Sequence, residues 1–222
     1  MAENLTILPV LLLSVVLHEV AHGVVALWCG DSTARDMGRL TLNPIPHLDL
    51  VGSIIVPLFS LMSAGHVFIA WAKPVPVNPA NFHNIRRDNI LVSAAGPLTN
   101  FVVAGMCTTA FIILKLIFSM IDGGMSETAV DFINFLATMF HAGILLNIVL
   151  AIFNLIPVPP LDGSHILAAF LPQWAADRYR AVGFFGIFII IILMSVPLVN
   201  RIFFVIIYIL ETPFELLIRL FT

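Results

Sequence analysis

The first apolar stretch of the chain contains three ionisable side chains. It runs from Leu5 to Leu27 and is long enough to cross a bilayer core, which takes roughly 20 apolar residues in a helix. Within it lie His18, Glu19 and His22. An acid at membrane depth costs on the order of 2.5–3.5 kcal/mol, so three ionisable groups in close succession indicate a function inside the membrane.

The spacing of these residues is typical of a metal-binding helix. In the pattern His-Glu-x-x-His the two histidines are four positions apart, so both imidazoles lie on one helix face and can reach one metal ion. Glu19 lies beside them and can take a proton from a water on that metal. The pattern also arises by chance in soluble helices, but chance explains it poorly where each polar side chain costs free energy. The sequence therefore predicts a zinc hydrolase site within the membrane.

The composition independently indicates an integral membrane protein. Of the 222 residues, 60% are apolar and 10% are charged, and the mean hydropathy is +1.06. The 10 basic and 13 acidic residues are too few to cover a water-soluble globule of this size. A net charge of −3 gives no indication of nucleic-acid binding. Cys29 and Cys107 lack metal-ligand spacing and are interpreted as apolar packing residues.

Apolar runs and breaks predict an all-α polytopic membrane protein with five or six transmembrane helices. The first helix is expected from about Asn4 to Cys29, and Gly30 suits the C′ position after it. The later predicted helices are Ile90–Met120, Phe132–Leu155 and Ala181–Val196. The tail Leu198–Thr222 is either a further span or an interfacial helix. We expect a single domain over residues 1–222, in which residues 1–170 carry all motifs and residues 171–222 form accessory helices.

Basic residues predict the orientation in the membrane. The acidic connection Asp122–Asp131 contains no base and is expected outside, which places the connection Lys73–Arg87 and the loop around Arg178 inside. The basic loop after the first helix also belongs inside, so the apolar run Leu50–Trp71 is predicted to be re-entrant. If that run spans instead, one basic loop lies on the wrong side. This arrangement opens the site toward the cytoplasm, and we expect the bacterial inner membrane as the location.

A catalytic zinc ion takes three protein ligands and keeps one position open. Candidates for the third ligand are Asp36, Asp49, Asp88, Asp162, His47, His66, His83, His141 and His165. Asp162 stands out because it follows a proline-rich break, and irregular backbone at membrane depth must be buried in protein or line a wet cavity. Gly163 would permit a close approach to a metal. Alternatively, Asp162 only caps a short helix over Gly163–Phe170, and the local pattern leaves both readings open.

Three motifs together resemble one family, the site-2 proteases, which are intramembrane zinc metalloproteases. They are HEVAHG at 18–23, AGPLTNF at 95–101 and NLIPVPPLDGSHIL at 154–167, in the family's order, and the resemblance covers the chain to about Leu167. It implies that His18, His22 and Asp162 bind one Zn²⁺ per chain and that Glu19 is the catalytic base. It also implies that Asn154 acts near the active site. The apolar insertion before residue 72 and Ser164 depart from the family's pattern.

The second motif is expected to pack against the first. Ala95 and Gly96 are small and would let this predicted helix start approach the motif helix closely, with Gly96-Pro97 distorting it. Asn100 is interpreted as a hydrogen-bonding packing residue rather than a catalytic one. The amide of Asn154 would donate to the oxyanion or position the substrate backbone, and the alternative is a polar contact between helices.

The resemblance implies a single-span membrane protein as substrate, cut in or near its transmembrane segment. Such a helix must unwind locally, and KPVPVNP at 73–79 is predicted to form a small membrane-associated β-element that could pair with an extended peptide. The alternative is a rigid proline-rich loop. Without an appended PDZ or CBS domain, regulation is expected through a membrane partner or a homo-oligomer in the lipid bilayer.

Two other functions compete with proteolysis. A zinc transporter or channel would predict inverted repeats or broken helices in corresponding halves, and the sequence shows neither. It would also leave Glu19 between the histidines unexplained. A catalytically inert scaffold is disfavoured by the intact His-Glu-x-x-His pattern and Asp162.

Overall fold

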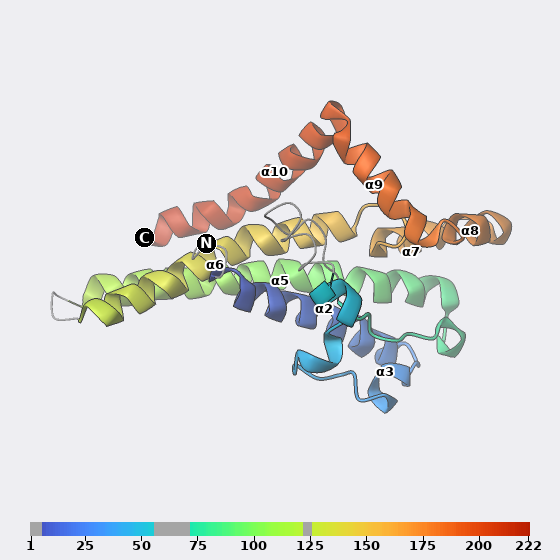
Figure 1. The fold of residues 1–222 in the computed structure, drawn as a ribbon, viewed down its shortest axis with the longest axis horizontal. Coiled ribbons are helices and arrows are strands. Elements are labelled where there is room, and N and C mark those ends of the chain that lie inside the picture. Colours follow the sequence, from blue (N-terminus) through green and yellow to red (C-terminus); the bar gives the residue numbers. More distant parts are fainter. Residues whose placement is uncertain (1–5, 56–71, 122–125) are drawn as a thin grey trace.

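The computed structural model describes residues 6–55, 72–121 and 126–222, and these residues form helices, turns and loops without a β-strand (Figure 1). The longest helices are α2 (Leu8–Trp28), α5 (Ile85–Met120), α6 (Glu127–Asn154) and α10 (Pro197–Phe221). The shorter helical elements are α3 (Thr33–Asp36), η1 (Ile45–His47), η2 (Leu50–Ile55), η3 (Pro79–Asn81), α7 (Asp162–Ala168), α8 (Gln173–Arg180), η4 (Gly183–Phe185) and α9 (Gly186–Ser195).

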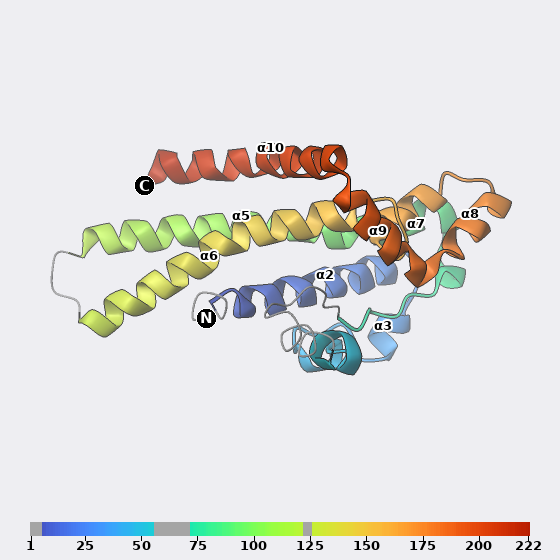
Figure 2. The same ribbon diagram turned by 45° about the horizontal axis from the view of Figure 1, so that its top comes forward.

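Helices α2, α5 and α6 lie side by side, and α10 packs against α5 and α6 (Figures 1 and 2). An apolar cluster in their shared core joins Val10 of α2 to Ala104 of α5 and Ile148 of α6. Small residues let these helices approach closely, because a Cβ on Gly143 would lie 2.8 Å from Val10 Cγ2. The bundle therefore holds α2, with its metal-binding motif, against two longer helices.

By length and composition, α2, α5 and α6 could each cross a membrane. Helix α8 and the segment Gly183–Ser195 are bent by 69° relative to each other. They would form a fourth crossing if the two were counted as one span. Helix α9 ends at Ser195 because Val196 precedes a proline and is extended. At 1.5 Å per residue its 10 residues cover about 15 Å, half of the bilayer core. The prediction of five or six spans is therefore too high for the part that the structure describes.

Large apolar side chains cover the outer faces of the helices. Leu98, Val102 and Met106 on α5 and Phe188 and Ile192 on α9 are all exposed. A soluble monomer rarely exposes continuous apolar surface of this kind, whereas lipid tails match it. Together with the apolar spans, this surface identifies an integral membrane protein.

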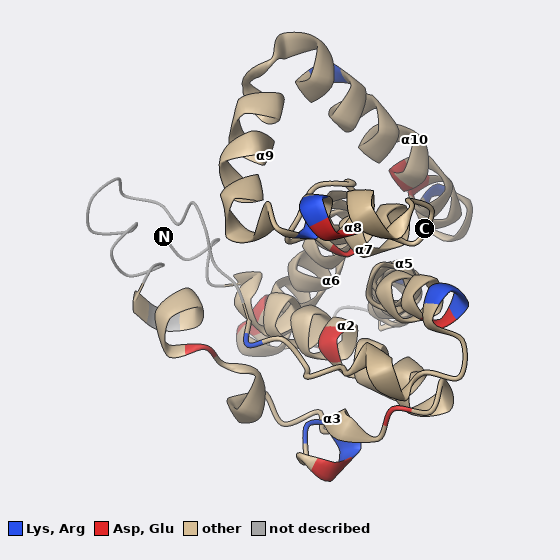
Figure 3. Cartoon of the chain, turned by 90° about the vertical axis from the view of Figure 1, so that its right-hand side faces the viewer, with Lys and Arg blue, Asp and Glu red and all other residues tan. Residues whose placement is uncertain are grey.

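The basic connections gather at one end of the bundle. Figure 3 views this end, where coloured segments appear in α3, in α8 and at the start of α5. The basic residues concerned include Arg35, Arg87 and Arg178, which belong to the three connections that were predicted to share one side of the membrane. The C-terminal end of α5 and the N-terminal end of α6 lie at the opposite end (Figure 1).

Helix α5 begins at Ile85, five residues before the predicted start. The side chain of Asn84 accepts a hydrogen bond from the Arg87 N–H at 3.0 Å and caps the helix there. The motif AGPLTNF therefore lies within α5, with Pro97 inside the helix, and the prediction that it begins the helix is wrong.

The predicted β-element at Lys73–Pro79 is also wrong, because residues 72–78 pair with no other strand in the described chain. Three prolines in this segment lack the N–H that a ladder needs. The predicted re-entrant run Leu50–Trp71 lies mostly outside the described residues, which include only the π-helical turn Leu50–Ile55.

Candidate metal centre

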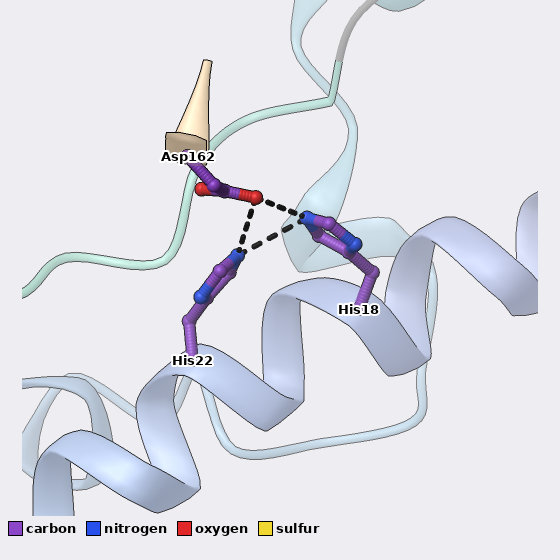
Figure 4. A group of neighbouring side chains, drawn as sticks. All are labelled: His18, His22 and Asp162. Atoms are coloured by element: carbon purple, nitrogen blue, oxygen red, sulfur yellow. Dashed lines mark hydrogen bonds and ion pairs between the residues drawn. The ribbon is translucent and has the colours of Figure 1, made fainter. Parts of the chain in front are cut away.

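His18, His22 and Asp162 meet at one point (Figure 4). Asp162 Oδ2 lies 3.1 Å from His18 Nε2 and 3.4 Å from His22 Nε2, and the two Nε2 atoms are 3.1 Å apart. Both imidazoles are buried, and both come from the middle of the candidate span α2. Among the described residues, this is the group with three ligand atoms within 4.8 Å of one another.

Asp162 reaches the histidines because the chain turns sharply after α6. Helix α7 begins at Asp162, and Leu161 occupies the N-cap position without a side-chain cap. The alternative role of Asp162 as a helix cap is therefore wrong. A Cβ on Gly163 would lie 2.2 Å from the Leu155 carbonyl oxygen, so the close approach that this glycine permits is to the end of α6.

The outer nitrogens of both imidazoles contact acceptors. His18 Nδ1 lies 3.1 Å from Asn100 Oδ1, and His22 Nδ1 lies 2.7 Å from the Val92 carbonyl oxygen. Since a carbonyl oxygen only accepts, each Nδ1 carries the hydrogen and each neutral imidazole keeps a bare Nε2. The two Nε2 lone pairs thus face each other and a carboxylate oxygen.

Such a donor set suits a cation at its centre. Three lone-pair atoms this close repel one another, and Asp162 Oδ2 is buried without a hydrogen-bond donor. Two imidazole nitrogens and one carboxylate oxygen form the three-ligand set that catalytic zinc sites use, with room for a fourth ligand. The residues therefore fit one zinc ion.

Electrostatics keep the Asp162 carboxylate ionised. Burial acts to raise its pKa, but imidazoles of His18 and His22 that carry a proton on Nε2 outweigh burial and hold the pKa below its ordinary value, and a cation between the three groups would act in the same direction. Three residues on, burial lowers the pKa of His165 and favours its neutral form. An ionised carboxylate beside bare imidazole nitrogens is the form in which all three groups can bind a metal.

Because Gly96 has no side chain, the imidazoles of His18 and His22 can occupy the space next to its Cα. A Cβ at this position would lie 2.4 Å from His22 Nε2 and 2.5 Å from His18 Nε2. The expectation that Gly96 allows close packing against the motif helix is confirmed. The contact of Asn100 with His18 was not predicted from the sequence. A signal was present, because Gly96 and Asn100 are four positions apart and share a helix face, as do the two histidines that they face.

The two predicted catalytic residues form hydrogen bonds with backbone groups. Glu19 Oε2 accepts a hydrogen bond from the Val75 N–H at 2.8 Å. The Asn154 amide, in the last turn of α6, donates to the Leu150 carbonyl at 2.9 Å. The other candidate ligands Asp36, Asp49, Asp88, His47, His83, His141 and His165 do not join the group, and His66 lies outside the described residues.

Comparison with known proteins defines the class of this membrane protein. The model of the family described as Peptidase family M50 matches residues 6–195. The chain belongs to this family, the site-2 proteases, so the resemblance found in its three motifs is confirmed.

Curated relatives carry metalloprotease names. The Bacillus subtilis protein "Putative zinc metalloprotease YwhC" is 39% identical over 188 residues, which cover 85% of this chain and 79% of the relative. "Putative zinc metalloprotease Rip2" is 27% identical in Mycolicibacterium smegmatis and 29% identical in Mycobacterium tuberculosis H37Rv, with 89% of this chain and 69% of each relative covered. No solved structure matches the chain.

Proposed function

We propose that this chain is an intramembrane zinc endopeptidase that cuts single-span membrane proteins in or near their transmembrane segment. The observation that carries the proposal is the facing set of His18 Nε2, His22 Nε2 and Asp162 Oδ2, half-way along a candidate span. A water-dependent reaction at this depth would require a wet path from the charged end of the bundle, where α7 and α8 lie (Figure 1).

Each residue near the centre has a distinct part in this reaction. His18, His22 and Asp162 would hold zinc, which when bound polarises the scissile carbonyl and acidifies the attacking water. Asn100 and the Val92 carbonyl keep both imidazoles in the tautomer that leaves Nε2 free. Glu19 would accept the proton of the water and deliver it to the leaving amine.

Asn154 is the candidate for a second contact with the substrate. One N–H of its amide donates to Leu150, and an amide has two N–H groups. The remaining N–H could donate to the carbonyl oxygen under attack, an interaction typically worth roughly 3–4 kcal/mol of transition-state stabilisation.

The orientation is part of the proposal. The basic connections and α7 lie at one end of the bundle, which supports an active site that opens toward the cytoplasm. The Bacillus and mycobacterial relatives support a bacterial inner membrane as the location.

The test compares wild type with Glu19→Gln and Asp162→Ala, each purified and mixed with a model single-span substrate. We expect one zinc per chain and cleavage for wild type, zinc without cleavage for Glu19→Gln, and loss of zinc for Asp162→Ala. Full zinc in Asp162→Ala would exclude Asp162 as an essential ligand. Cleavage by Glu19→Gln at the wild-type rate would exclude Glu19 as the base. Zinc without cleavage in the wild type would favour the transporter or scaffold alternative.

A further inference from the structure

The segment that donates to Glu19 packs closely on the motif helix. Val75 is buried, and a Cβ on Gly23 would lie 3.0 Å from Val75 Cγ1. Gly23 is four residues after Glu19, so both face the same side of α2. The buried Val75 side chain therefore packs on α2 next to the hydrogen bond between the Val75 N–H and the Glu19 carboxylate.

No strand partner holds this segment in the described part of the chain. Its N–H groups belong to Lys73, Val75, Val77 and Asn78, because the prolines have none. Lys73 donates to the His47 carbonyl at 2.9 Å, and Asn78 donates to Asp31 Oδ2 at 2.7 Å. Side chains and loop carbonyls, rather than a β-ladder, thus fix where Val75 lies.

Arg39 holds the segment just before Val75. Its guanidinium is buried, and Nη2 donates to the carbonyl oxygens of Lys73 at 2.8 Å and Pro74 at 3.3 Å. A buried charged donor makes stronger hydrogen bonds than a neutral one. The Arg39 guanidinium, which is planar and rigid, therefore fixes the backbone of Lys73 and Pro74 directly before the Val75 N–H.

Asp31 holds the segment just after Val77. It is fully buried; Oδ2 accepts from the Asn78 N–H, and Oδ1 accepts from the Asn81 side chain at 2.8 Å. The Thr33 N–H also donates to Oδ1 at 3.2 Å, which fixes the carboxylate to its own loop. Asp31 and Arg39 both belong to the loop that follows α2, so this loop reaches back and anchors the segment on both sides of Val75.

We propose that Arg39 and Asp31 are positioning residues for Glu19, acting through the backbone of residues 73–78. By fixing the Val75 N–H, they hold Oε2 of Glu19 and leave Oε1 free for the proton of the attacking water. A glutamate without this hydrogen bond would sample several rotamers, and a misplacement of about 1 Å can cost about 100-fold in rate. This inference rests on the proposed function of Glu19 as the base.

The main test measures kcat, KM and zinc content for Arg39→Gln, Arg39→Lys and the matched control Arg35→Gln. Arg35 lies on the same loop, is exposed and pairs with Asp36. We expect Arg39→Gln to keep zinc and KM while kcat falls on the order of 10–100-fold. Arg39→Lys should recover part of kcat, since an ammonium also donates to carbonyls, and Arg35→Gln should match wild type.

A second readout does not depend on activity. Hydrogen exchange of the peptide over residues 73–82 should be faster in Arg39→Gln and Asp31→Asn than in wild type, and unchanged in the exposed control Asp36→Asn. Asparagine at position 31 keeps one acceptor oxygen and cannot serve both carboxylate positions, so the Asn78 hydrogen bond or the Oδ1 contacts are lost.

Specific outcomes would overturn the inference. Wild-type kcat in folded Arg39→Gln, or a rise in KM alone, would show that Arg39 does not position the base. Unchanged hydrogen exchange in both variants would remove the proposed link through the backbone. Failure of the proposed function is separate, because it would appear in the wild type itself as zinc without cleavage.

Discussion

Each ligand residue of the candidate metal centre is oriented by a neighbouring part of the chain. Asn100 and the Val92 carbonyl select the tautomers of His18 and His22, and the start of α7 directs Asp162. Loss of one outer contact of this kind typically costs about 10–100-fold in metal affinity. Substitutions that never touch the metal should therefore change zinc binding.

Replacing Gly96 with alanine should abolish zinc binding. The new Cβ would lie 2.4 Å from His22 Nε2 and 2.5 Å from His18 Nε2, so the imidazoles must move out of ligand position. Zinc content of the purified variant measures the effect. Gly105→Ala on the same helix is the control, because its Cβ would meet only Phe214 at 4.0 Å. Equal zinc in both variants would contradict the close packing of α5 under the imidazoles.

Replacing Asn100 with alanine should weaken zinc binding by about 10–100-fold, because His18 loses the acceptor that orients its ring. Competition with a chelator of known affinity measures the change. Asn89→Ala serves as the control, since this half-buried side chain near the start of the same helix donates to the Ile85 carbonyl rather than to the imidazoles. An unchanged affinity in Asn100→Ala would show that packing alone orients His18.

At the scale of elements, α2 uses two neighbouring faces for different partners. His18 and His22 face Gly96 of α5 and the start of α7, whereas Glu19 and Gly23 face Val75. Both pairs have the four-residue spacing of a single helix face. One helix thus brings the candidate ligands and the candidate base to two separate elements, and the loop after α2 ties the second element down.

The anchoring by Asp31 should depend on pH. Burial acts to raise the pKa of Asp31, but hydrogen bonds from Thr33, Asn78 and Asn81 outweigh it and lower the pKa below its ordinary value. Because the pKa is lower in the folded state, the stability that the carboxylate contributes is present above the unfolded pKa of about 4 and is lost as the pH falls through the folded value.

The difference in Tm between wild type and Asp31→Asn measures this contribution. We expect the difference to be constant between pH 6 and pH 5 and to shrink as the pH is lowered toward 3. Asp36→Asn, at an exposed position of the same loop, provides the comparison. A difference that stays constant down to pH 3 would show that the ionised form of Asp31 is not what stabilises the loop.

The whole molecule combines an apolar outer surface with one charged end. Exposed apolar side chains lie along α5 and α9, whereas α3, α8 and the start of α5 carry charged segments in Figure 3, which also shows charged segments on α10. This distribution supports lipid around the helices and water at their charged end. The side of the membrane that this end faces is set by its basic residues.

Single cysteines tested with a membrane-impermeant maleimide should report the orientation. Arg178→Cys and Arg35→Cys should react only after the inner face is opened, and Ser126→Cys should react in intact cells. Cys29 and Cys107 are buried, so the native background should be low. Reaction of Arg35→Cys and Ser126→Cys from the same side would show that the run before residue 72 crosses the membrane, against the re-entrant arrangement.

The spacing of residues along the chain was enough to predict the class of fold, the family and the candidate site. The four-residue interval of His18 and His22, the apolar runs and the three motifs predicted a membrane bundle, its family and a His-His-Asp centre. These features depend on helix geometry and on the match between apolar side chains and lipid. Residues close together in the sequence specify both. For the described residues the predicted number of spans was too high, because the apolar run Ala181–Val196 does not show that a turn at Gly183–Phe185 leaves an α-helix of only 10 residues.

Only the tertiary structure decided which distant groups meet. Asn100 contacts His18 across 82 positions, and Val75 donates to Glu19 across 56. The alternation in residues 73–79 predicted a β-element, but a strand needs a partner, and the described chain supplies Arg39, Asp31 and Glu19 instead. Spacing along the chain specifies which side chains share a face, whereas the partner of that face depends on how whole helices and loops pack.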